Sequence, residues 1–208
     1  MTADLEAEPR IAASLFGDHI DQGRAFASDL VRWGEELGLI GPQEPARLWS
    51  RHLVNSVLVA PLLRPGRVGD IGSGAGLPGL VLAIARPDAR LVLVEPMERR
   101  VDWLREEADR LGLANVEVLR ARAEDAGDLR LDQVTARAVA ALKSLIPITV
   151  PLARAGGELI FMKGARVNDE VAAARKQIAQ ARLTNAEVLE LGGGLVPDVT
   201  RVFRATVG

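Results

Sequence analysis

The sequence contains no cysteine and no tyrosine, and its aromatic residues are four phenylalanines and three tryptophans. Without cysteine the chain forms no disulfide, builds no thiolate metal site and carries no cysteine nucleophile. So few aromatic rings argue against a single-strand nucleic-acid binder, because such proteins stack bases on aromatic side chains. The formal net charge of −2 argues against a protein that coats nucleic acid through bulk positive charge.

Long apolar runs are missing as well, because no stretch approaches the roughly 18 residues that a membrane-spanning helix needs. The opening residues, MTADLEAEPR, are acidic and lack the apolar core of a secretory signal. We therefore expect a cytoplasmic protein with no membrane partner. Its 208 residues, 48% hydrophobic and 26% charged, suit one globular α/β domain with a modest extension.

The spacing of apolar residues changes character near residue 65. Before it, helical spacing predicts helices over 18–38 and 44–63. After it, short β-branched runs alternate with longer helical patterns, which predicts right-handed crossovers in a mostly parallel sheet. The expected strands lie near 67–71, 90–95, 116–120, 132–136, 157–162, 184–190 and 200–206, and the expected helices near 77–86, 97–112, 140–153 and 167–181.

The last two expected strands have only the loop GGGLVPD between them, so they should form an antiparallel hairpin at the edge of the sheet. The fold class is therefore α/β, with a mostly parallel, Rossmann-like sheet of seven strands and an antiparallel edge strand. Residues 1–64 are expected to pack as a helical extension on a core of residues 65–208, which gives one compact unit.

A glycine-rich loop, DIGSGAGLPG at 70–79, follows the first expected strand and fits three kinds of ligand unequally. Gly74 and Gly79 have the spacing of a nucleotide P-loop, but Leu80-Val81 replace the lysine and hydroxyl that such a loop needs. A dinucleotide is harder to exclude, because the loop satisfies GxGxxG and Glu95 ends the next strand. S-adenosylmethionine is the third candidate, because Asp70-x-Gly72-x-Gly74-x-Gly76 resembles motif I of its methyltransferases.

The residues favour S-adenosylmethionine. Glycines let the backbone approach the ligand closely, and the carboxylate of Asp70 suits a cation better than a pyrophosphate. Glu95 can accept both ribose hydroxyls, and Ala123-Glu124 follow the third strand, where an acceptor suits the adenine amino group. The alternative is that Glu95 and Glu124 are solvated loop acids, which is less plausible at the ends of consecutive strands.

Beyond the loop, the chain resembles the ribosomal RNA small subunit methyltransferase G family, also called glucose-inhibited division protein B, within the class I methyltransferases. The resemblance rests on these blocks: LWSRHLVNSV (48–57), VGDIGSGAGLPGLVLAI (68–84), EPMERRVDWLREEADRLGL (95–113), ARAED (121–125), TARAVAAL (135–142) and FMKG (161–164). It implies S-adenosylmethionine-dependent methylation at N7 of a guanine in the streptomycin-linked decoding loop of 16S ribosomal RNA. It also implies cofactor contacts at the motif I loop with Gly72 and Leu77, at Ala123-Glu124 and at Arg137.

The residues agree with this chemistry by exclusion. Methylation at C5 of a pyrimidine normally needs a cysteine nucleophile, and methylation of an exocyclic amine goes with (N/D)PP(Y/F), where this chain reads TARAVA. Guanine N7 already carries a lone pair and loses no proton, so we expect a positioning mechanism without a general base or a metal ion. For the RNA we expect a basic rim of His52, Arg137, Lys163 and Arg201, in which Arg137 contacts guanine O6 or the methionine carboxylate.

Other cations and two other functions stay open. Arg99, Arg100, Arg105, Arg110, Arg120 and Arg122 form either a phosphate-contacting surface or, for the first two, a solvated helix face, while Trp103 is expected in the core. One alternative function is an NAD(P)-dependent oxidoreductase, and the other is a non-catalytic ribosome assembly factor that binds S-adenosylmethionine. The expected partner is 16S RNA within the small subunit or an assembly intermediate, recognised by a monomer that binds naked RNA poorly.

Overall fold

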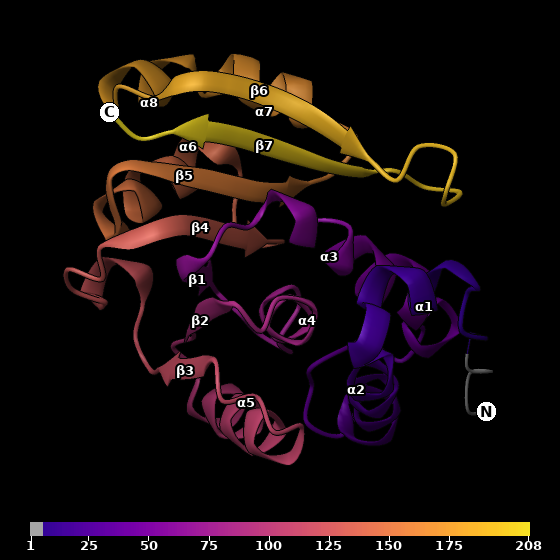
Figure 1. Ribbon diagram of the computed structural model, residues 1–208. Coiled ribbons are helices and arrows are strands. Elements are labelled where there is room, and N and C mark those ends of the chain that lie inside the picture. The colour runs from indigo at the N-terminus through magenta and orange to yellow at the C-terminus, as the bar shows by residue number, and fades with distance from the viewer. Residues whose placement is uncertain (1–5) are drawn as a thin grey trace.

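The computed structural model describes residues 6–208 and places seven strands in one sheet of order β3-β2-β1-β4-β5-β7-β6 (Figure 1). Strands β1 to β5 run parallel, and β7 lies antiparallel between β5 and β6. The predicted mostly parallel α/β sheet with an antiparallel edge hairpin is confirmed. The strand bounds are β1 Gly66–Ile71, β2 Ala89–Val94, β3 Val116–Leu119, β4 Leu131–Arg137, β5 Ala153–Lys163, β6 Thr184–Leu191 and β7 Thr200–Thr206.

The helices that follow the strands are α4 (Gly79–Ala85), α5 (Glu98–Arg110), α6 (Leu142–Thr149), α7 (Val167–Ala173) and α8 (Arg175–Gln180). The helix expected over 167–181 is thus two helices, because the chain turns at the buried Ala174. The helix expected over 140–153 is shorter at both ends, since residues 138–141 form a non-helical connection that bends at 138 and 139, and 150–152 form a 3₁₀ turn.

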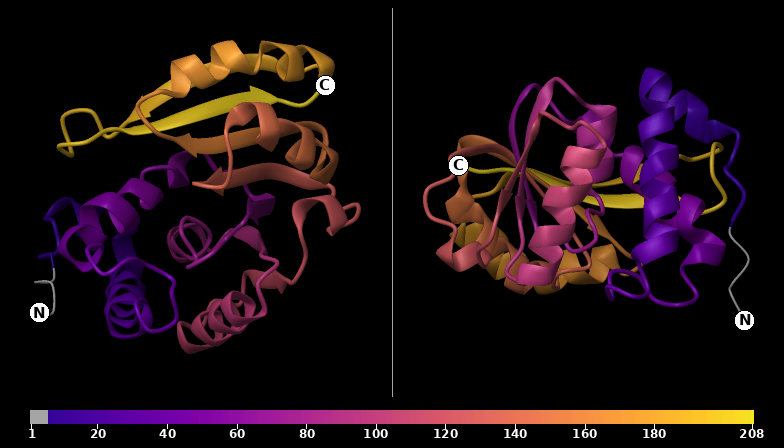
Figure 2. Two further views of the ribbon diagram at one scale, coloured as in Figure 1. Left: turned by 180° about the vertical axis from the view of Figure 1, so that it is seen from behind. Right: turned by 90° about the horizontal axis from the view of Figure 1, so that it is seen from below.

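Helices cover both faces of the sheet, as the view from below shows (Figure 2). The alternation of side chains along β2 builds the two cores: Leu91 and Leu93 belong to the cluster with α4 and α5, while Val92 and Val94 belong to the cluster with α6 and α7. Both faces of the central strands are therefore apolar, as a parallel sheet buried on each side requires.

The N-terminal region consists of α1 (Ile11–Phe16), α2 (Ile20–Trp33) and a chain of short turns that ends in α3 (Asn55–Val57). Two predictions are wrong here. The helix expected over 18–38 ends at Trp33, because the chain folds back so that the N–H groups of Leu39 and Ile40 both donate to the Gly34 carbonyl. A Cβ at Gly34 would lie 2.6 Å from the Ile40 side chain, so this reversal requires a glycine.

The segment expected as one helix over 44–63 is instead a 3₁₀ turn, a π-helix over Leu48–Val54, the short α3 and a second 3₁₀ turn. The wider π turn buries five of its seven residues, including Trp49 and His52. Regular α-helical spacing would rotate some of these side chains away from the core. The sequence pattern identified the apolar content of this segment and not its pitch.

The N-terminal region packs on the sheet domain through one shared apolar cluster, in which Phe16, Phe26 and Leu30 lie with Leu80 and Leu82 of α4. It also reaches the edge where the parallel strands end, since the Thr200 hydroxyl at the start of β7 donates to the Asn55 carbonyl at 3.2 Å. The division at residue 64 stays a prediction, and residues 1–5 of the expected extension lie outside the described part. Among residues 6–208 no helix is long and apolar enough to cross a membrane.

Candidate functional site

The glycine loop leaves the end of β1 and crosses the end of β2. The N–H groups of Gly72 and Ser73 donate to the Val94 carbonyl at 2.8 and 3.3 Å. Gly72 has a φ of +70°, which an L side chain rarely adopts, and a Cβ there would lie 2.8 Å from Val139 Cγ2. Gly72 therefore presents bare backbone to its surroundings, and the Val139 side chain packs close against it.

Asp70 lies beneath this loop, fully buried, and does not face a cavity. Its Oδ2 accepts the N–H of Gly79 at 3.0 Å, and its backbone carbonyl accepts the Ser73 hydroxyl at 2.8 Å. Burial raises the pKa of Asp70 to about 7, although the Gly79 bond and the charge of Arg137 oppose that rise. In this structure Asp70 ties the two ends of the loop together.

Glu95 directly follows β2 and also holds the glycine loop, but unlike Asp70 it lines a cavity. Its Oε2 accepts the N–H of Gly74 at 2.9 Å and its Oε1 accepts the N–H of Met97 at 3.0 Å. The residue is 2% exposed. Each carboxylate oxygen has a second lone pair, so Glu95 can hold the loop and still accept a hydroxyl from a ligand.

A cavity of about 370 Å³ opens where β1, β2, β3 and β4 end. Four of the predicted cofactor residues line it together: Gly72, Glu95, Ala123 and Glu124. Asp70, Gly74, Leu77 and Arg137 do not line it. Ligands of open α/β sheets bind at this edge, and the structure brings half of the predicted cofactor residues together there.

Sequence reasoning missed two apolar side chains in this cavity. Met97 and Val139 both line it and remain 46% and 41% exposed, although they are large and hydrophobic. Each follows the end of a strand, β2 for Met97 and β4 for Val139, and this position was the available signal. Exposed apolar side chains around a few polar groups are typical of a site that receives a largely apolar ring system.

Arg100 and Arg122 also line the cavity, where the sequence allowed only a phosphate surface or a solvated face. The Nε of Arg100 is buried and has no hydrogen-bond partner. A buried donor without a partner is costly, and a ligand with acceptor atoms would satisfy it. This donor, the bare backbone at Gly72 and the acceptor carboxylates of Glu95 and Glu124 together fit the adenosyl part of S-adenosylmethionine.

Arg137 turns away from the cavity toward the N-terminal region. Its Nη2 lies 2.6 Å from His52 Nδ1 and its Nη1 donates to the Ser56 hydroxyl at 3.2 Å. Because an arginine only donates, His52 Nδ1 must accept, and Nε2 therefore carries the proton that faces Glu44 Oε2 at 2.5 Å. Residues 44, 52 and 137 thus form one chain of hydrogen bonds from the extension to the end of β4.

The pKa values of this chain follow from burial and charge. Burial and the positive charge of Arg137 lower the pKa of His52 against the opposing effect of Glu44. Burial raises the pKa of Glu44, but hydrogen bonds from Arg47 and His52 outweigh it and bring that pKa to about 2. Burial and the charge of Arg51 lower the pKa of Arg137 to about 10, so at neutral pH the chain consists of an anion, a neutral imidazole and a cation.

Lys163 and Arg201 are cross-strand partners at this edge of the sheet, in the β5–β7 register. Neither cation is free in the structure. Lys163 Nζ lies 2.7 Å from Glu170 Oε2 and donates to the Ala140 carbonyl at 2.8 Å. Arg201 Nε donates to Glu190 Oε1 at 2.8 Å. The four residues of the expected basic rim therefore lie in two groups, His52 with Arg137 and Lys163 beside Arg201.

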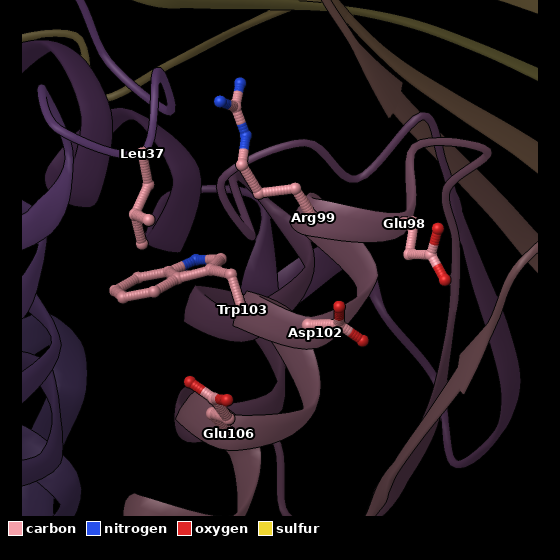
Figure 3. A pocket seen from close by; sticks show the side chains of 6 residues that line it. All are labelled: Leu37, Glu98, Arg99, Asp102, Trp103 and Glu106. Carbon is pink, nitrogen blue, oxygen red and sulfur yellow. The ribbon is translucent and has the colours of Figure 1, made fainter.

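A larger hollow of about 460 Å³ lies elsewhere, between the turn after α2 and the first turns of α5. Figure 3 shows Leu37 above the Trp103 ring, with Arg99 extended to one side and the carboxylates of Glu98, Asp102 and Glu106 spaced along the helix. Trp103 is buried as expected, and its Nε1 donates to the Ala75 carbonyl of the glycine loop at 3.1 Å. No strand ends in this hollow. We therefore assign the ligand site to the smaller cavity at the ends of β1 to β4. Within residues 6–208 no group of three acidic or histidine side chains is placed to hold a metal ion.

Comparisons with known proteins agree with this geometry. The family model for rRNA small subunit methyltransferase G matches residues 19–196. A protein called ribosomal RNA small subunit methyltransferase G from Clavibacter michiganensis subsp. michiganensis is 64% identical over 204 residues, which cover 98% of this chain and 97% of the relative. The protein of the same name from Leifsonia xyli subsp. xyli is 60% identical over 208 residues and covers 100% of each chain.

Solved structures share the fold at low identity. A SAM-dependent O-methyltransferase from Thermotoga maritima has a TM-score of 0.58 and 16% identity, covering 79% of this chain and 70% of the other. The tRNA (m1A58) methyltransferase TrmI from Aquifex aeolicus also has a TM-score of 0.58 and 16% identity, covering 74% of this chain and 68% of the other.

Proposed function

Since this chain belongs to the ribosomal RNA small subunit methyltransferase G family, we propose that it transfers a methyl group from S-adenosylmethionine to N7 of a guanine in 16S ribosomal RNA. The observation that carries the proposal is the cavity at the carboxyl ends of the strands. There a bare glycine backbone, two carboxylates and an arginine donor without a partner lie around two exposed apolar side chains.

The chemistry asks little of the protein beyond placement. S-adenosylmethionine, when bound, supplies an electrophilic methyl group. Guanine N7 is an acceptor with a free lone pair, so no side chain needs to remove a proton. The chain has to hold the cavity wall rigid and the base in place. Asp70 and Glu95 support the wall through their bonds to Gly79, Gly74 and Met97.

The roles of individual residues are part of this proposal. We assign the cofactor to Asp70, Gly72, Gly74, Leu77, Glu95, Ala123, Glu124 and Arg137, with the first acting through the loop, and the RNA to His52, Arg137, Lys163 and Arg201. The three cations of the rim already have partners: Arg137 donates to the neutral His52, Lys163 pairs with Glu170, and Arg201 donates to Glu190. Such a rim offers little free charge to bare phosphates, which supports an assembled small subunit or an assembly intermediate as the substrate. A cytoplasmic monomer as the active form is part of the same proposal.

The test combines binding with product mapping. Calorimetry with S-adenosylmethionine and, separately, NADH identifies the ligand. Small subunits that lack 7-methylguanine are then incubated with protein and cofactor, and the nucleosides of their 16S RNA are mapped. We expect heat from S-adenosylmethionine alone and new 7-methylguanine in the subunit RNA.

Other outcomes separate the alternatives. Heat from NADH alone would make the protein an oxidoreductase. Heat from S-adenosylmethionine without methylation of subunits, protein-free RNA or intermediates would favour an assembly factor. Methylation of protein-free RNA as fast as of subunits would contradict the proposed substrate.

A further inference from the structure

The connection between β4 and α6 forms one wall of the cofactor cavity. Ala138 and Val139 both line the cavity. Ala138 has a φ of +55°, an uncommon conformation for a residue with a side chain, and Val139 approaches the glycine loop so closely that a Cβ at Gly72 would lie 2.8 Å from it. Such a conformation persists only where the surrounding structure holds it.

Two side chains from neighbouring elements hold the far end of this connection. Lys163, the last residue of β5, donates to the Ala140 carbonyl at 2.8 Å. Leu142 is the first residue of α6, and its N–H donates to the Glu170 side chain in α7 at 3.0 Å. The two side chains also pair with each other, with 2.7 Å between Lys163 Nζ and Glu170 Oε2. The two members of this ion pair thus hydrogen-bond to the backbone on either side of Ala141.

The burial of this pair explains why it is directed at the backbone. The Lys163 side chain is 9% exposed and the Glu170 side chain 27% exposed. A buried ammonium is costly unless it is paired and hydrogen-bonded, and both requirements are met here by Glu170 and Ala140. The N–H groups in the first turn of a helix also lack partners, and Ala141 has no side chain that caps α6. Glu170 supplies that cap from another helix.

At the near end, Arg137 is fixed by His52 and Ser56. This part of the cavity wall therefore consists of Ala138 and Val139, which lie between two fixed points. One is Arg137, and the other is the backbone at 140–142 that Lys163 and Glu170 hold. Loss of either anchor would free Ala138 to leave its uncommon conformation and would move Val139 relative to Gly72.

We propose that Lys163 and Glu170 are positioning residues, which fix residues 138–142 in the conformation that shapes the cofactor cavity. The inference rests on the proposed function, because it concerns the same cavity. It gives Lys163 a task in addition to the proposed contact with RNA, because its bonds to Ala140 and Glu170 are made before any RNA binds.

The experiment measures S-adenosylmethionine binding by calorimetry without RNA, together with the melting temperature of each variant. Lys163→Met should weaken binding by about tenfold or more, because it removes a charge-assisted bond to the Ala140 carbonyl. Glu170→Gln should weaken it less, because the amide oxygen still accepts from Leu142. The double variant should bind no more weakly than Lys163→Met alone, since both changes disrupt the same ion pair. Lys163→Arg should restore part of the affinity.

Arg154→Met is the matched control. Arg154 also donates to a carboxylate and to a backbone carbonyl, at 2.7 Å to Asp132 and 2.8 Å to Ala155, but at the opposite end of β5. It should bind S-adenosylmethionine as the wild type does, whatever its melting temperature. Ala138→Val tests the wall itself, because a β-branched residue resists a positive φ, and it should reproduce the loss with the ion pair intact.

The outcomes are separable. A wild-type protein that does not bind S-adenosylmethionine contradicts the proposed function. A wild type that binds, with Lys163→Met binding equally well but methylating subunits with a raised KM for the subunit, contradicts the positioning role and assigns Lys163 to the RNA. Additive losses in the double variant would show that the two side chains do not act as one unit.

Discussion

Three glycines with similar positive φ angles offer a quantitative test of the site. Gly72, Gly74 and Gly112 have φ values of +70°, +56° and +66°. They differ in what an added methyl group would meet. At Gly112, after α5, it meets nothing within 4 Å; at Gly74 the nearest atom is a carbonyl oxygen at 3.8 Å; at Gly72 it meets Val139 Cγ2 at 2.8 Å.

The left-handed conformation costs an L-residue about 1–2 kcal/mol. Each of the three alanine variants should therefore lose about that much stability, which lowers the melting temperature by roughly 2–4 °C per kcal/mol in a chain of this size. Only Gly72→Ala should also displace Val139 and fill the cavity beside the loop. We expect its affinity for S-adenosylmethionine to fall by at least tenfold, which is about 1.4 kcal/mol.

Thermal unfolding and calorimetry on the three variants decide the matter. Gly112→Ala is the control for backbone strain far from the cavity, and Gly74→Ala tests an open position within the same loop. If Gly72→Ala binds S-adenosylmethionine as tightly as Gly112→Ala, then neither Val139 nor the bare backbone at Gly72 shapes the ligand site. A larger loss in Gly74→Ala than in Gly72→Ala would place the ligand on the other side of the loop.

Two further predictions follow from the buried ionisable groups. The pKa of about 7 at Asp70 means that the folded protein keeps a proton that the unfolded chain releases near pH 4, so this group destabilises the fold as pH rises toward 7. Asp70→Asn should therefore gain about 3 kcal/mol relative to wild type between pH 5 and pH 8 in urea unfolding, and an unchanged difference would mean that Asp70 is ionised throughout. The chain has two histidines, so NMR can follow His52, whose pKa lies below its usual value because of burial and the charge of Arg137. Glu44→Gln should lower that pKa further; a rise would refute the proton assignment on Nε2.

The sequence predicted those parts of the site that are local. Gly72, Glu95 and Ala123-Glu124 each stand at the end of a strand, and parallel strands bring their carboxyl ends to one edge. The pattern therefore located the cavity without any contact being known. The same argument explains the strands, because runs buried on both faces are continuous and easily recognised.

The parts that sequence reasoning missed depend on contacts between distant segments. Arg137 is also placed at a strand end, but its direction is decided by Ser56, 81 positions earlier in the chain. The π turn of 48–54 follows from the need to bury both Trp49 and His52, which apolar spacing does not specify. Likewise, the sequence predicts that Lys163 ends a strand, but it does not show that the Lys163 ammonium forms an ion pair with Glu170 in the following helix.

The position of β7 between β5 and β6 has a consequence for the order in which the protein forms during synthesis. β6 pairs with β7 alone among the described strands, yet β7 is the last of these seven strands to be made. Until residues 200–206 leave the ribosome, β6 has no partner and the outer edge of β5 is open. An open edge of this kind pairs readily with other chains. The Thr200 bond to Asn55 also waits for this strand, so both the completion of the sheet and this contact with the N-terminal region depend on the last of the seven strands to be translated.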